Sequence, residues 1–84
     1  MQITLKLFAM LQDYLPPEAR QNNALRLELD EGSTIAHVIE RFALPPKYCH
    51  LVLIDGNFIS PDDRTGRVLR DGEVMAIWPP IAGG

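Results

Sequence analysis

A single amphipathic helix set among short apolar segments is the feature that most constrains the fold of this 84-residue chain. The apolar residues at helical spacing are Ile35, Val38, Ile39 and Phe42. Ser33 or Thr34 can cap the start of this helix, and Pro45 and Pro46 end it. Because no glutamate follows at the spacing of a capping box, we expect one side-chain oxygen to be the only cap.

Alternating side chains predict two strands before this helix. In residues 2–9, the side chains that share one face are Ile3, Leu5, Leu7 and Ala9. Residues 25–29 alternate in the same way, with leucine at every second position. Between the two strands, residues 10–15 have the spacing of one or two helical turns, which Pro16 and Pro17 would end. Residues 16–23 indicate a loop.

The second half of the chain predicts a hairpin and a final strand. Residues 50–60 contain two short apolar runs around Asp55 and Gly56, a pair that suits a tight two-residue turn. Residues 61–66 indicate a polar surface loop, and residues 68–72 form another turn. Residues 74–78 are all apolar and predict the last strand.

This order of elements predicts an α+β fold. One helix with a single apolar stripe needs one sheet face to cover it, so we expect a mixed sheet of four or five strands with the helix packed on one side. The first and last strands would lie adjacent and parallel in the middle of the sheet, which is the β-grasp, or ubiquitin-like, topology. The other sheet face would stay open. Residues 1–84 are too few for a second domain.

Composition excludes several classes of function. Cys49 is the lone cysteine, which rules out an internal disulfide framework and a cysteine-ligated iron–sulfur cluster. The net charge of −3 disfavours nucleic acid as a partner. No apolar run is long enough to span a membrane, and no signal peptide is visible, so we expect a cytoplasmic protein without membrane contact.

Few side chains suggest chemistry within the body of the chain. We expect Cys49 to be a packed hydrophobic residue and His37 to be solvated. His50 adjoins Cys49, but neighbouring side chains on a strand point to opposite faces, so we expect no metal pair. The acidic residues indicate turns and solvated surface. We therefore expect neither a metal nor a bound cofactor, and a protein that is acted upon rather than an enzyme.

Three stretches of the chain resemble the small sulfur-carrier proteins of the MoaD/ThiS family. They are LFAML after the first strand, EGSTIAHVI at the helix and LRDGEVMAIWPPIAGG at the end. The ending with two prolines is more similar to the small subunit of molybdopterin synthase than to the thiamine-pathway carrier. The sequence departs from the family at Asp55, where asparagine is common, and in the loop SPDDRTGR.

The resemblance implies that the C-terminal carboxylate of Gly84 is the reacting group. A partner adenylyltransferase would use ATP and Mg²⁺ to form an acyl-adenylate on Gly84. Sulfide delivered by a sulfurtransferase would then replace AMP and leave a terminal thiocarboxylate. The large subunit of molybdopterin synthase would use this sulfur for the molybdenum cofactor, and the present chain would be its small subunit.

The residues before Gly84 predict a flexible tail, residues 79–84. Gly83 and Gly84 lack a Cβ atom and can thread a narrow partner channel, with Ile81 and Ala82 leading into it. Pro79 and Pro80 either hold the tail extended or simply end the strand.

A partner-binding patch is expected on the open sheet face. If Ile3, Leu5 and Leu7 point toward the helix, Phe8 points outward. If Met75 and Ile77 also point inward, the outward residues of the last strand are Val74, Ala76 and Trp78. The opposite parity, with Trp78 in the core, fits the uniformly apolar strand as well.

A sulfur carrier for another pathway, such as thiamine biosynthesis, remains open, and so do two functions of other classes. A ubiquitin-like modifier would also activate its terminal glycine, but it would join that glycine to a lysine amine. A β-grasp module that binds partners non-covalently would carry the tail without using it. Covalent conjugates would favour the first alternative, and full activity without Gly83 and Gly84 would favour the second.

Overall fold

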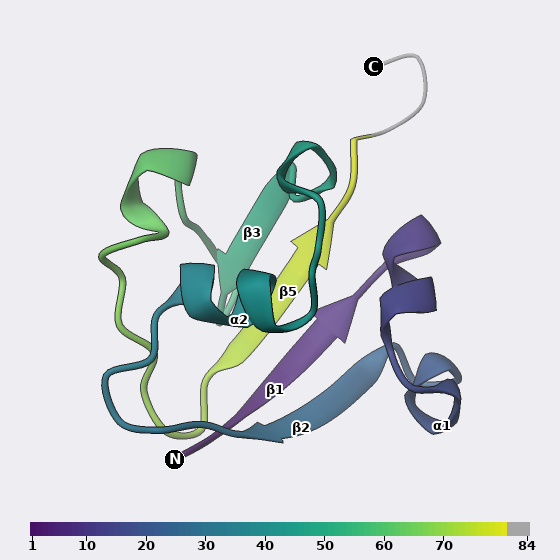
Figure 1. The fold of residues 1–84 in the computed structure, drawn as a ribbon, viewed down its shortest axis with the longest axis horizontal. Helices are drawn as coiled ribbons and strands as arrows, with labels where there is room; N and C mark the ends of the chain where they lie inside the picture. Colours follow the sequence, from purple (N-terminus) through teal and green to yellow (C-terminus); the bar gives the residue numbers. More distant parts are fainter. Residues whose placement is uncertain (81–84) are drawn as a thin grey trace.

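Strands β1 (Gln2–Leu7) and β5 (Val74–Trp78) lie side by side and parallel at the centre of a five-stranded sheet (Figure 1). The computed structural model describes residues 1–80. The other strands are β2 (Ala24–Glu28), β3 (Leu51–Ile54) and β4 (Asn57–Phe58). The strand order is β2-β1-β5-β3-β4, and every neighbouring pair except β1 and β5 is antiparallel. The predicted β-grasp topology is therefore confirmed.

One face of this sheet carries the core. Leu5 of β1 lies opposite both Leu25 and Met75, and Val52 lies opposite Ile77. Most of these side chains are buried, and helix α2 (Ile35–Arg41) covers the same face (Figure 1). Ile35 and Val38 are buried, as the apolar stripe predicts. Within residues 1–80, no helix is both long and apolar enough to cross a membrane.

The cap of α2 differs from the prediction. Thr34 Oγ1 accepts a hydrogen bond from the His37 N–H at 3.3 Å, which is the expected oxygen cap. The His37 side chain completes a capping box, because its Nδ1 accepts the Thr34 N–H at 3.0 Å. The expectation of a single cap was wrong, since an imidazole nitrogen at this position can accept the bond that a glutamate usually accepts. His37 itself is exposed, as predicted.

Two short helices follow β1. The predicted helical turn is the 3₁₀ helix η1 (Ala9–Tyr14), but β1 ends at Leu7. Ala9 adopts a positive φ of 53°, so the chain reverses there, and Ala9 is exposed rather than facing the core. The expected loop over residues 16–23 contains the short helix α1 (Pro17–Arg20). Proline suits the first position of a helix because its φ is already helical and its missing N–H is not needed there.

The predicted hairpin and turns are confirmed. Leu53 and Phe58 lie opposite each other, and the turn between β3 and β4 is Asp55-Gly56, with φ values of 49° and 86°. The Asp55 carboxylate also accepts the Val74 N–H at 2.8 Å, so the turn holds the start of β5. The remaining 3₁₀ helices are η2 (Pro46–Tyr48) and η3 (Pro61–Asp63).

Candidate functional site

Trp78 ends the central strand β5, and its indole stacks on the ring of Phe8. The ring centroids are 4.0 Å apart and the planes differ by 7°. The Phe8 N–H donates to the Ile77 carbonyl at 3.2 Å, which fixes the backbone beneath the stack. Met75 and Ile77 are buried, whereas Trp78 is 40% exposed. The predicted outward facing of Trp78 is therefore confirmed, and the alternative that places it in the core is wrong.

The apolar surface around Trp78 is larger than the sequence suggested. In the sheet, Leu51 lies opposite Trp78, and Leu53 lies between Ala76 and Phe58. Directly opposed residues share a sheet face. The outer-face patch therefore comprises Phe8, Leu51, Leu53, Phe58, Val74, Ala76 and Trp78.

Three residues of the outer-face patch were missed from the sequence. Leu51 and Leu53 are half-buried, and Phe58 is 56% exposed at the sheet edge. The signal was present, because a two-residue turn at Asp55-Gly56 places Phe58 opposite Leu53. The predicted members of the patch do share one face, and their role in binding a partner stays a prediction.

Strand β5 ends at Trp78, and Pro79 and Pro80 follow it (Figure 1). Of the predicted tail, residues 79–84, the structure describes Pro79, which is buried, and Pro80, which is exposed. Ile81, Ala82, Gly83 and Gly84 lie outside the described residues. The predictions for these four residues therefore stay predictions.

The end of β5 is also held from the side opposite Phe8. The His50 N–H donates to the Trp78 carbonyl at 3.2 Å. The Arg64 guanidinium in turn donates to two backbone carbonyls, from Nη1 to Cys49 at 2.7 Å and from Nη2 to His50 at 3.4 Å. The predicted polar surface loop over residues 61–66 is exposed at every residue except Arg64, which is buried. The loop turns this one side chain inward because its planar fork satisfies two carbonyls at once.

Cys49 and His50 point to different sides of the chain. Cys49 is buried and His50 is exposed, as their adjacent positions predict. Burial raises the pKa of the Cys49 thiol, although the nearby Arg64 opposes this shift. Burial likewise lowers the pKa of Arg64. A buried thiol with a raised pKa holds its proton at neutral pH, which suits packing and not nucleophilic attack.

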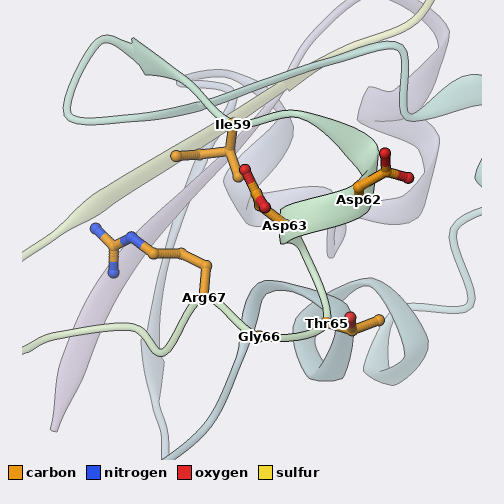
Figure 2. A pocket seen from close by; sticks show the side chains of 6 residues that line it. All are labelled: Ile59, Asp62, Asp63, Thr65, Gly66 and Arg67. Atoms are coloured by element: carbon orange, nitrogen blue, oxygen red, sulfur yellow. The ribbon is translucent and has the colours of Figure 1, made fainter.

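A shallow hollow lies in the loop after β4. Its lining residues are Ile59, Asp62, Asp63, Thr65, Gly66 and Arg67 (Figure 2). Asp63 accepts the Ser60 hydroxyl at 3.0 Å, and Arg67 forms an ion pair with Glu73 at 2.6 Å. These charges hold the loop together. In the part of the chain that the structure describes, no group of three His, Cys, Asp or Glu side chains is placed to bind a metal ion.

A family model described as Mut7-C ubiquitin matches residues 1–82. The chain belongs to the Mut7-C ubiquitin family. No curated protein sequence matches it significantly.

Solved structures show the same fold at low sequence identity. SAMP1 from Haloferax volcanii is 19% identical with a TM-score of 0.68, and the match covers 100% of both chains. The putative molybdopterin converting factor subunit 1 from Pyrococcus furiosus is 20% identical with a TM-score of 0.63, covering 95% of this chain and 98% of that one. A chain from the complex of subunits 1 and 2 of molybdopterin-converting factor from Helicobacter pylori is 13% identical with a TM-score of 0.60. The match covers 100% of the present chain and 100% of that chain.

These matches confirm the ubiquitin-like fold that the sequence predicts. The match to the Mut7-C ubiquitin model over residues 1–82 supports the resemblance to the MoaD/ThiS family, and the solved structures of molybdopterin-converting factor share the fold.

Proposed function

We propose that this protein is a ubiquitin-like sulfur carrier whose reacting group is the carboxylate of Gly84. The observation that carries the proposal is the position of Trp78. The central strand ends there, beside an exposed apolar patch, and residues 79–84 follow it. A partner that docks on this patch is therefore next to the chain end on which it acts.

The chemistry requires an activating partner. The Gly84 carboxylate is ionised at neutral pH and is a poor electrophile, because a nucleophile would have to expel an oxide. In the proposed reaction a carboxylate oxygen attacks the α-phosphorus of ATP, assisted by Mg²⁺, and pyrophosphate leaves. Sulfide from a sulfurtransferase then attacks the acyl carbon. AMP leaves with one of the original carboxylate oxygens, and the terminal thiocarboxylate remains.

The length of the tail limits where a partner can bind. Pro79 is buried and Pro80 is exposed, so the reach of the chain end is counted from Pro79. At most ~3.6 Å per residue, residues 80–84 reach no more than about 18 Å from the body. The reacting atoms of the adenylyltransferase must therefore lie within that distance of Pro79. The outer-face patch extends along β5 as far as Trp78, and we propose it as the docking surface.

We propose molybdopterin synthesis as the pathway, with a large synthase subunit as the sulfur-using partner. The similarity to subunit 1 of the Helicobacter pylori complex supports this assignment, because that protein is bound to its subunit 2. The Pro-Pro-Ile-Ala-Gly-Gly ending supports it as well. In this role the chain is a carrier that becomes part of an enzyme only within the complex.

A protein modifier is the second candidate. The similarity to SAMP1, a small archaeal modifier protein, favours it. The first step would be the same adenylation of Gly84, but a lysine amine of another protein would then attack the acyl carbon to form an isopeptide bond.

Intact mass spectrometry separates the two functions. The purified protein is incubated with ATP, Mg²⁺, a sulfide source and the adenylyltransferase. A sulfur carrier gains the mass difference between sulfur and oxygen, located in its last peptide. Higher-mass conjugates joined through Gly84, without that gain on the free protein, would support the modifier and contradict the carrier.

A further inference from the structure

We infer that Arg64 is a positioning residue for the chain end, because it fixes the place and direction in which the chain leaves β5. The inference rests on the proposed function, in which the segment after Pro79 carries Gly84 to a partner. Arg64 lies far from Gly84 in sequence and belongs to the loop SPDDRTGR.

Three hydrogen bonds connect Arg64 to the end of β5. Its Nη1 donates to the Cys49 carbonyl at 2.7 Å, and its Nη2 donates to the His50 carbonyl at 3.4 Å. The His50 N–H donates to the Trp78 carbonyl at 3.2 Å. Leu51 and Trp78 are the last paired residues of β3 and β5, so the bond from His50 closes this ladder. Arg64 thus holds the carbonyl of the same peptide whose N–H makes the closing bond, and the carbonyl of the next peptide.

The burial of Arg64 shows that this contact is costly to form. Its exposed fraction is 9%, and among residues 1–80 no carboxylate lies within ion-pair distance of it. Its Nε also has no acceptor among the described residues. Burying a guanidinium without a carboxylate is unfavourable, so its hydrogen bonds to Cys49 and His50 must offset that cost. A lysine cannot reproduce them, because it lacks the planar fork that reaches two acceptors.

Loss of the Arg64 guanidinium removes a restraint on the segment that follows β5. Without Arg64, the His50 peptide is restrained on one side only, and the ladder between β3 and β5 opens at its last bond. Trp78 and the residues after it then sample more directions. A partner that accepts only one direction of the chain end binds only the molecules that have this direction. When their fraction falls, the apparent KM rises by the inverse of that fraction. The maximal rate stays the same, because Arg64 does not touch the atoms that react.

The test compares two arginines that each bind two carbonyls. Arg20 donates to the carbonyls of Leu15 and Asp13 at 3.1 Å, at the C-terminal end of the 3₁₀ helix η1 and away from β3. Arg64→Leu and Arg20→Leu are examined by amide hydrogen exchange and by steady-state adenylation of Gly84. For Arg64→Leu we expect the His50 amide to exchange about tenfold faster, because a hydrogen bond from a charged donor is lost. We expect KM to rise about threefold to tenfold with kcat unchanged. For Arg20→Leu we expect neither change.

Each outcome decides the inference. If both variants lose thermal stability but His50 exchange and KM remain at wild-type values, Arg64 is structural only and the inference is wrong. If Arg64→Leu fails to fold, Arg64→Lys replaces it, and we expect faster His50 exchange and a raised KM again. An Arg64→Lys protein with wild-type exchange and KM overturns the inference. If the wild-type protein is not adenylated, the proposed function fails, while exchange of the His50 amide still decides whether Arg64 holds the strand end.

Discussion

The ring of Phe8, directly after β1, lies parallel to the indole of Trp78 at the end of β5, with centroids 4.0 Å apart. The two central strands are parallel, so their C-terminal ends lie next to each other at the same end of the sheet. Phe8 leads into η1, and Trp78 is followed by the buried Pro79. The stack therefore places an exposed aromatic surface at the root of the tail.

Trp78→Ala tests this surface as a docking site. We expect partner affinity to fall about 30-fold or more, because large aromatic side chains commonly dominate interfaces. The loss of the stack should lower the free energy of unfolding by only ~0.5–1.5 kcal/mol beyond the loss of buried area. Titration calorimetry with the adenylyltransferase measures the affinity, and urea unfolding measures the stability. Val68→Ala, which removes a side chain that is 45% exposed and lies outside the outer-face patch, is the control. Equal affinities for the two variants would exclude the patch.

Gly84→Ala tests whether the residue that carries the reacting carboxylate must lack a side chain. The added methyl group lies beside the acyl carbon and obstructs the approach of ATP and of sulfide. We expect adenylation to slow by about 100-fold, the size of effect that a misplacement of about 1 Å can cause. The unfolding midpoint should not change. Thiocarboxylate formation is followed by intact mass, and an undiminished rate would contradict the proposed role of Gly84.

Thr34→Ala separates stability from function. Thr34 caps α2 on the covered face of the sheet, away from the outer-face patch. Loss of the cap should lower the free energy of unfolding by about 0.5–2 kcal/mol. Adenylation should keep its wild-type rate at temperatures where the protein is folded. Ser33→Ala is the matched control, because the Ser33 hydroxyl donates to the Asp30 carbonyl and does not cap the helix. A smaller loss for Thr34→Ala than for Ser33→Ala would contradict the assigned cap.

Glu73 gives a prediction about pH. Burial alone would raise the pKa of this carboxyl, but hydrogen bonds from Arg67 and from the Arg70 N–H outweigh it, so the pKa of Glu73 is lowered from 4.5. A lowered pKa means that the carboxylate stabilises the folded state fully above pH 4.5. This contribution is lost as the pH falls through the lowered value.

The matching variant is Glu73→Gln. We expect it to lower the free energy of unfolding by about 1–3 kcal/mol at pH 7, the scale of a charged hydrogen bond. The difference from wild type should shrink as the pH falls below 4.5. Urea unfolding at several pH values measures both effects, with the exposed Glu31→Gln as control. A difference that is constant with pH would show that the charge of Glu73 does not stabilise the fold.

Much of the fold follows from the sequence because it depends on periodicity. The alternation in residues 2–7 and the stripe from Ile35 to Phe42 each define one buried face, and one sheet covered by one helix satisfies both. The Asp55-Gly56 turn fixes the register of the hairpin by its own backbone preference.

The details that the sequence did not predict depend on tertiary contacts. Nothing in local propensity shows that Ala9 adopts a positive φ, which the chain accepts because η1 must turn back from β1. Arg64 turns inward because its guanidinium donates to the carbonyls of Cys49 and His50, which are distant in sequence. The facing of Trp78 was ambiguous because every residue of its strand is apolar, and only the parallel register with β1 decides it.

The central claim is that the reacting group is the carboxylate of Gly84 and that the folded body presents it to other proteins. The most direct test compares two preparations of this chain that differ only in a free terminal carboxylate or a terminal amide. Each is mixed with the adenylyltransferase, ATP, Mg²⁺ and labelled pyrophosphate, and the exchange of label into ATP is measured. We expect exchange with the free carboxylate and none with the amide, although both preparations bind the enzyme. Equal exchange with both would show that the chain end is not the group that reacts.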